Sequence, residues 1–219
     1  MTNTIISLWQ KYGYVYISGL TGTLWLAGIT VFAASILGTV IAILKLSKIK
    51  ILDLAVNAYI GVLRGTPILL QLYFFWLLLP KVTPFSLSDT ACIVVALIVN
   101  ASSYVAEVIR AGIQAVDKGQ GEAGKSLGLS NWNVMRKIIL PQAIKNILPA
   151  LGNEYISMVK QTSLASVFFV SELMTSYKTV QSATFLSLPS LVIVGIIYLV
   201  VTSILSKGIN VFERSLQNG

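Results

Sequence analysis

Two apolar stretches of this sequence carry polar side chains that recur at the spacing of a single helix face. Asn100, Ser103 and Glu107 fall on one side of the first stretch, and Asn153 and Glu154 fall on one side of the second. Lipid cannot satisfy amide, hydroxyl or carboxylate groups, so an ionisable residue inside a membrane span indicates a functional site by default. We therefore expect the two faces to meet each other or to line a wet cavity that binds a polar ligand.

Glu154 is the most informative of these groups because no cation lies one helical turn away from it. It lies about 20 Å into its apolar stretch, near the middle of a membrane. Its charge needs Arg64 or Lys160 from elsewhere in the chain, a bound proton, or a cationic ligand, and the sequence leaves these alternatives open. Glu107 differs, since Arg110 three residues later favours a structural ion pair.

Composition excludes several kinds of chemistry. The chain has no histidine and one cysteine, Cys92. Histidine-based acid–base catalysis, Ser-His-Asp triads and histidine metal sites are thereby excluded, and a single thiol forms neither an internal disulfide nor a metal cluster. We therefore expect no metal site and no catalytic residues. An intramembrane enzyme would need a nucleophile with a base, or a metal set, and the sequence offers neither.

Residues 119–126 read G-Q-G-E-A-G-K-S and match the phosphate-binding pattern G-x-x-x-x-G-K-[ST] letter for letter. Such a loop must follow a buried strand and open a helix, and it works with an Asp that follows an apolar strand. Residues 111–118 do not form a buried strand, and no aspartate follows four apolar residues in a row. We interpret the match as accidental.

The overall composition is that of a membrane protein. Of 219 residues, 55% are hydrophobic and 11% are charged, and the mean hydropathy is +0.80. Soluble domains are about a quarter charged, and a membrane-spanning helix takes roughly 20 apolar residues. We expect an all-α, polytopic transmembrane bundle in which residues 1–219 form one domain and no cleaved signal peptide precedes it. The five expected spans are 24–44, 66–79, 89–112, 141–163 and 188–206, and residues 166–187 remain ambiguous.

Lysine and arginine set the expected orientation. The net charge of +8 is interpreted as topological because the basic residues lie between apolar runs, so no nucleic acid partner is expected. With the N-terminus outside and the C-terminus inside, eleven basic residues are cytosolic and three are external, and the polar loop 113–137 is cytosolic. The eleven are Lys45, Lys48, Lys50, Arg110, Lys118, Lys125, Arg136, Lys137, Lys145, Lys207 and Arg214.

Small and aromatic residues indicate packing and depth. Gly28 and Gly38 are predicted to allow close helix contact. The aromatic residues between Trp9 and Tyr16 predict a belt at a membrane interface. In the cytosolic loop, residues 117–127 are expected to form a short helix closed by Gly128, and Ser130 is expected to cap the next helix.

One long, gapped motif resembles a known family. Glu122-Ala123-Gly124, three residues, Gly128, nine residues and then I-I-L-P at 138–141 resemble the cytosolic "EAA" loop of permeases of ABC importers. The one departure is Gly124, where the family usually has Ala, which is expected to loosen the helix by roughly 1 kcal/mol. The resemblance implies that residues 113–140 couple the permease to an ATPase.

Three further stretches resemble the polar amino acid uptake permeases: residues 65–72 (G-T-P-I-L-L-Q-L), 101–110 and 160–164 (K-Q-T-S-L). The resemblance implies a type I ABC importer permease fold in the plasma (inner) membrane. It also implies three kinds of partner: a second permease subunit, identical or related, two cytosolic ATPase subunits, and an external solute-binding protein. ATP and Mg²⁺ would belong to the ATPase, and this chain would hold no cofactor and hydrolyse nothing.

We expect import of polar amino acids by alternating access, with a cationic amino acid as the guest that supplies the charge for Glu154. A secondary transporter or channel for small polar solutes is the alternative, although it would leave the coupling loop without a purpose. The candidate substrate-binding residues are Glu154, Asn100, Ser103, Gln71, Asn153, Ser163 and Thr162. The candidate ATPase-coupling residues are Glu122, Ala123, Gly124, Leu127 and Gly128.

Overall fold

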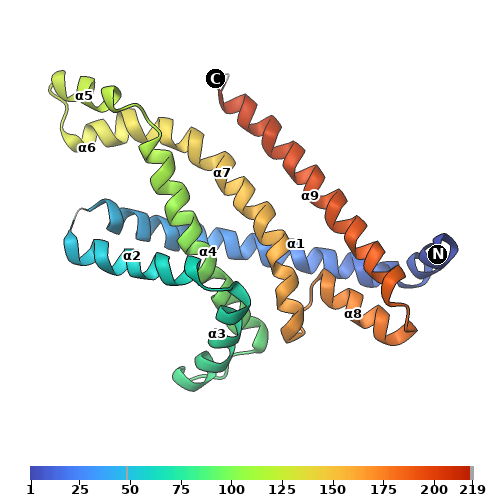
Figure 1. The fold of residues 1–219 in the computed structure, drawn as a ribbon. Helices are drawn as coiled ribbons and strands as arrows, with labels where there is room; N and C mark the ends of the chain where they lie inside the picture. The colour runs from blue at the N-terminus through green and yellow to red at the C-terminus, as the bar shows by residue number, and fades with distance from the viewer. Residues whose placement is uncertain (48, 218–219) are drawn as a thin grey trace.

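The computed structural model describes residues 1–47 and 49–217, and within them every regular element is helical, as expected. Lys48, one of the basic residues counted above, lies outside the described residues. Figure 1 shows the helices in chain order. They are α1 (Thr2–Leu46), α2 (Lys50–Gly65), α3 (Ile68–Val82), α4 (Asp89–Gln114), α5 (Lys118–Ser126), α6 (Asn131–Val134), the π-helical turn η1 (Met135–Ile139), α7 (Leu140–Gln161), the 3₁₀ helix η2 (Thr162–Phe168), α8 (Leu173–Thr184) and α9 (Ser187–Gln217).

The first helix is much longer than the span expected at 24–44. α1 has 45 residues and is unbroken, because no proline interrupts it and no charge occurs between Tyr12 and Leu44. At 1.5 Å per residue it is about 68 Å long, roughly twice the hydrocarbon thickness of a bilayer. Figure 1 shows α1 crossing α4 and α7 at a steep angle, and it contacts both helices.

The chain breaks where Pro67 predicts a break. Thr66 is extended, with φ −118° and ψ 149°, and α2 and α3 meet at an angle of 110°. The helix after the break runs past the expected end of the span, because Pro80 lies inside α3 and does not terminate it.

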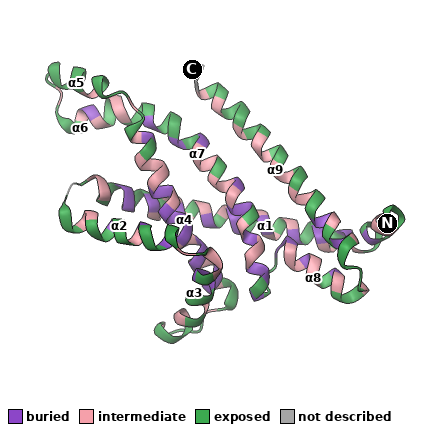
Figure 2. Ribbon diagram, in the orientation of Figure 1, coloured by how far each residue is buried: buried purple, intermediate pink, exposed green. Residues whose placement is uncertain are grey.

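The core forms where α1, α4 and α7 cross. Figure 2 shows the buried residues concentrated there, whereas α9 is exposed along most of its length. α4 contributes the most fully buried face, including Ile93, Leu97 and Val105. Gly38 of α1 lies so close to Val105 that an added Cβ would be 2.7 Å from its Cγ1, which confirms the close packing predicted for Gly38. A Cβ added at Gly28 would have no neighbour within 4 Å among the described residues, so the close helix contact predicted for Gly28 is wrong.

Residues 166–187, which the sequence left ambiguous, form the end of η2, a sharp turn and α8. The fully buried carboxylate of Glu172 begins α8 by accepting hydrogen bonds from the Met174 and Thr175 amides. It also accepts a hydrogen bond of 3.2 Å from the Tyr198 hydroxyl of α9. The Thr23 hydroxyl of α1 accepts one of 3.0 Å from the Leu173 amide. These bonds hold the segment against α1 and α9.

Three helices are long and apolar enough to cross a membrane, or four if α2 and α3 count as one bent span. They correspond to the expected spans at 24–44, 66–79, 89–112 and 188–206. α7 covers residues 141–161 of the expected span 141–163, whose last two residues begin η2, and it carries the polar face described above. The count of five spans and the orientation with the N-terminus outside therefore stay predictions.

Two glycines of α1 give opposite predictions for the same substitution. A Cβ at Gly19 would be 2.9 Å from the Glu172 carbonyl oxygen and would press on the Ser176 hydroxyl, whereas a Cβ at Gly28 meets nothing. We expect Gly19→Ala to lower the free energy of unfolding by about 1–2 kcal/mol, since backbone crowding outweighs the gain in helix propensity. Gly28→Ala should raise it by up to about 1 kcal/mol. Thermal unfolding in detergent distinguishes them, and equal shifts would contradict the packing described here.

Candidate functional site

The break between α2 and α3 is held by two buried amide side chains. The Gln71 Nε2 donates hydrogen bonds of 2.8 Å to the Leu63 carbonyl oxygen and 2.8 Å to Thr66 Oγ1. Asn100 Nδ2, from α4, donates one of 2.8 Å to Gln71 Oε1 and one of 3.5 Å to the same Leu63 carbonyl. Only 6% of Gln71 and 3% of Asn100 is exposed.

This network has a clear physical cause. The last carbonyls of a helix lack intrahelical partners, and at this break the extended Thr66 and the following Pro67 supply none. In an apolar interior each such group must find another donor. Gln71 and Asn100 thus stabilise the bend between α2 and α3, which we call the elbow. The geometry favours this role over the direct substrate contact that the sequence predicted for both residues.

Arg64, in the last turn of α2 next to the elbow, is the cation that interacts with Glu154. The Arg64 guanidinium lies over the Tyr104 ring, 5.2 Å from its centroid, which is a cation–π arrangement. Arg64 also interacts electrostatically with the half-buried Glu154 of α7. Neither residue takes part in a salt bridge within residues 1–47 and 49–217. Among the alternatives left open above, the structure therefore brings Arg64 near Glu154 without pairing the two charges.

Three carboxylates of the helical bundle can be compared directly. Glu107 is paired at 2.7 Å with Lys45 and at 2.6 Å with Arg110, and Glu172 accepts the bonds described for α8. Glu154 has no salt bridge and no hydrogen bond to its carboxylate among the described side chains and main chain. A carboxylate left in this state within a bundle is the one whose charge a ligand can complete.

The remaining candidate residues lie on different sides of α4, α7 and η2. The hydroxyls of Ser103, Thr162 and Ser163 each donate to the carbonyl three residues earlier, over 2.7–2.8 Å, so each still has an acceptor oxygen. Thr162 and Ser103 are fully buried, whereas Ser163 is partly exposed. Asn153 is exposed and lines a groove between α7 and α9. The structure therefore does not bring all seven expected residues into one pocket.

The groove beside Asn153 has a volume of about 910 Å³. It follows the polar face of α7 from Gln142 through Asn146 to Asn153 and is closed on the other side by Glu213 and Leu216 of α9. Its cytosolic end, on the orientation expected above, begins at the junction of α4 and α5. The groove thus leads from that junction to the helix turn that carries Glu154.

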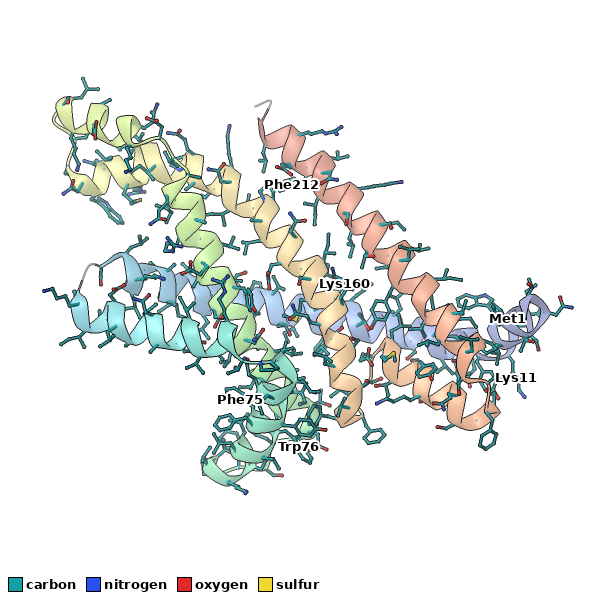
Figure 3. The ribbon with its side chains drawn as sticks, viewed as in Figure 1. Met1, Lys11, Phe75, Trp76, Lys160 and Phe212 are labelled. Atoms are coloured by element: carbon teal, nitrogen blue, oxygen red, sulfur yellow. The ribbon has the colours of Figure 1, made fainter. Side chains whose placement is uncertain are left out.

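An aromatic cluster that sequence patterns did not reveal ties α3 to η2. The Phe168 ring lies 4.8 Å from the Tyr73 ring and 5.6 Å from the Trp76 ring, centroid to centroid. Trp76 Nε1 also donates a hydrogen bond of 2.8 Å to Asp89 at the start of α4. Figure 3 places Trp76 and Phe75 on α3, below the crossing of the long helices, and Lys160 near the end of α7. The cluster therefore positions η2, which carries Thr162 and Ser163.

The loop between α4 and α7 has the local structure predicted for it. Asp117 begins α5 by accepting from the Gly119 amide at 2.7 Å, and Ser130 begins α6 by accepting from the Asn133 amide at 3.3 Å. Gly128 has φ +79°, and its amide and that of Leu129 bond back to the carbonyls of residues 125 and 124. Because residues 118–126 are an α-helix, their amides are not arranged to cradle a phosphate.

Gly124 is explained by packing. It is buried against α6 and η1, and an added Cβ would lie 2.7 Å from Ile138 Cδ1 and 3.1 Å from Val134 Cγ2. The glycine therefore allows a closer approach of α5 than the family's usual Ala would, which offsets its low helix propensity. On the other side of α5, Glu122 and Ala123 are exposed, and Leu127 is 82% exposed.

Residues 34–217 match the family described as binding-protein-dependent transport system inner membrane component. The chain belongs to this family. It is therefore a permease subunit of an ABC importer, and with several apolar helices it is a multi-pass protein of the plasma membrane.

Similarity extends over nearly the whole permease. The arginine transport system permease protein ArtQ of Bacillus subtilis (strain 168) is 37% identical over 202 residues, which cover 92% of each chain. The probable glutamine ABC transporter permease protein GlnM of the same organism is 36% identical, and the match covers 93% of this permease and 94% of GlnM. The crystal structure of an amino acid ABC transporter with histidines superposes with a TM-score of 0.91 at 43% identity, covering 96% and 98% of the two chains.

The elbow network predicts a stability effect that does not depend on substrate. Replacing Asn100 by Ala leaves Gln71 Oε1 and the Leu63 carbonyl with fewer donors, and we expect a loss of about 1–2 kcal/mol in the free energy of unfolding. Ser103→Ala is the control, because its hydroxyl bonds only to a carbonyl of its own helix. Thermal unfolding of the substrate-free permease measures both. Unchanged thermal unfolding of the Asn100→Ala variant would contradict the proposed role of Asn100 in stabilising the elbow.

Proposed function

We propose that this permease imports polar amino acids, with a preference for cationic ones, as the membrane subunit of an ATP-driven transporter. The observation that carries the proposal is the Glu154 carboxylate, which no described group pairs, together with Arg64, which interacts with it electrostatically but forms no salt bridge to it. A cationic amino acid carries one carboxylate and two cationic groups, and these complement one cation and one anion held apart. Relatives named for arginine and for glutamine transport support amino acids as the substrate class.

The binding mode follows from the charges. The α-carboxylate of the substrate binds Arg64, whose planar guanidinium suits a carboxylate, while Tyr104 holds that guanidinium from the other face. The cationic side chain binds Glu154. The acceptor oxygen of the partly exposed Ser163, nine residues beyond Glu154, is available to the α-ammonium group, whereas Thr162 next to it is fully buried. Gln71 and Asn100 do not contact the substrate; they stabilise the elbow next to Arg64.

Energy enters through the exposed side of α5. Glu122, Ala123 and Leu127 form the surface that docks on a cytosolic ATPase, while the buried Gly124 and the cap at Gly128 hold the helix in place. The full transporter contains two ATPase subunits, which bind ATP and Mg²⁺, a second permease subunit and an external solute-binding protein. The ATPases hydrolyse ATP, and this chain moves substrate by alternating access.

Glu154→Gln tests the substrate preference. Loss of the charge removes a desolvated ion pair with cationic substrates, and we expect their apparent affinity to fall about 30-fold or more. Uptake of glutamine, which lacks the side-chain cation, should fall much less. Competition between labelled arginine and unlabelled amino acids in proteoliposomes containing the complete transporter measures both.

The matched control is Asp53→Asn, which removes a carboxylate from the first turn of α2, where its hydrogen-bond partner is Asn57. It should leave the competition profile unchanged. Unchanged arginine affinity in the Glu154→Gln transporter would overturn the cationic preference. Arg64→Gln should still abolish uptake of every amino acid, because Arg64 binds the α-carboxylate that all of them share.

Leu127→Asp tests the docking surface. A charge at this exposed apolar position should weaken capture of the ATPase at least tenfold, as for the loss of an apolar anchor of an interface. Leu127→Met keeps the apolar surface and should bind normally. Co-purification of tagged permease with its ATPase measures the effect, and normal capture by the Asp variant would place the ATPase contact elsewhere.

A further inference from the structure

We propose that the Lys45–Glu107 ion pair makes α1 and α4 move as one rigid body during ATP-driven transport, and that Lys45 is a positioning residue for coupling. The inference rests on the proposed function, because it concerns how force from the ATPase travels beyond α5. Within residues 1–47 and 49–217, this is the one salt bridge that joins two different helices.

The pair lies at the end of a hydrogen-bonded chain. Lys45, in the last turn of α1, donates to Glu107 Oε1 at 2.7 Å. Glu107 Oε2 accepts from Arg110 Nε at 3.0 Å and Nη2 at 2.6 Å, and Arg110 Nη1 donates to Gln114 Oε1 at 2.6 Å. Arg110 and Gln114 both belong to α4, so only the bond from Lys45 joins two helices in this group.

α1 and α4 are joined by packing and by one polar contact. The buried core that α1 shares with α4 includes Leu26, Ala27 and Ala34. The close approach of Gly38 to Val105, where an added Cβ would be 2.7–2.9 Å from three atoms of α4, continues this packing. The ion pair, seven residues further along α1, holds the last turn of α1 to α4.

Contacts with α7 and bonds within the α4–α5 connection restrain the end of α4. Gly112 packs against Ile147 of α7, and the Asn146 side chain donates to the Gly112 carbonyl at 3.5 Å. The residues between α4 and α5 bond to the preceding turn, through the amides of Ala115 and Val116. A displacement of α5 therefore reaches α4 directly, and the ion pair passes it to α1.

Charge also argues for a mechanical role. The side chains of Lys45 and Glu107 are only 19% and 17% exposed, so solvent screens the pair weakly. Arg110 alone already neutralises Glu107 from within α4. Lys45 is thus not needed to satisfy the carboxylate, and what it adds is the connection between helices.

The test compares Lys45→Gln, which breaks the interhelical bond, with Arg110→Gln, which breaks only bonds within α4. In proteoliposomes with the complete transporter, we expect Lys45→Gln to lower labelled arginine taken up per ATP hydrolysed by about fivefold or more, with hydrolysis itself retained. Lys45→Arg should restore the ratio, and Arg110→Gln should change it little. A normal ratio in Lys45→Gln, or an equal loss in Arg110→Gln, would overturn the proposal.

A second measurement uses the intact ion pair and does not depend on how that variant folds. Spin labels at Ile43→Cys of α1 and Ala111→Cys of α4, both exposed positions, are placed in a Cys92→Ala background. The distance between the labels should be the same in nucleotide-free and vanadate-trapped transporter. A change between the two states would show that α1 and α4 move apart and would overturn the rigid body. If the unlabelled transporter neither hydrolyses ATP nor takes up amino acids, the proposed function fails instead.

Discussion

The absence of hydrogen-bond partners in lipid is the constraint on which the rest of this permease depends. A helix that breaks inside the membrane exposes carbonyl groups that lipid cannot satisfy. The break before Pro67 persists because Gln71 and Asn100 donate to the Leu63 carbonyl from two different helices. Their bonds hold α2 and α3 at 110° and present Arg64 beside the Tyr104 ring. The candidate site therefore rests on a bent pair of helices that two buried amides stabilise.

The same constraint separates structural carboxylates from the candidate functional one. Glu107 and Glu172 both lie in the bundle, and both are surrounded by donors that belong to the chain. Glu154 is half-buried and interacts electrostatically with Arg64 without forming a salt bridge to it. Under the proposed function, the partner of this carboxylate is a cationic substrate that binds and then leaves. A carboxylate that is already paired within the chain, as Glu107 is, would gain less from such a substrate.

Close helix contacts connect that site to α5. Glycine permits them at Gly38, Gly112 and Gly124, where a Cβ would overlap a neighbouring side chain. Backbones that approach this closely transmit displacement, because packed interiors deform little. The path from α5 through the end of α4 to α7 and α1 is therefore short and stiff, and the groove along the polar face of α7 lies beside it.

Local features were determined by the sequence alone. The break at Pro67, the helix start at Asp117, the cap at Gly128 and the false phosphate loop all depend on residues within one or two turns of each other, where backbone geometry decides the outcome. Only the tertiary structure decided which polar groups are satisfied. Lys45 is 62 residues from Glu107, and Gln71 is 29 residues from Asn100. It also decided that Gly38 packs while Gly28 does not, and that residues 173–184 form a helix held by α1 and α9. Spacing along one helix specifies a face, but the partner of that face comes from elements distant in the chain, and their approach depends on the packing of the whole bundle.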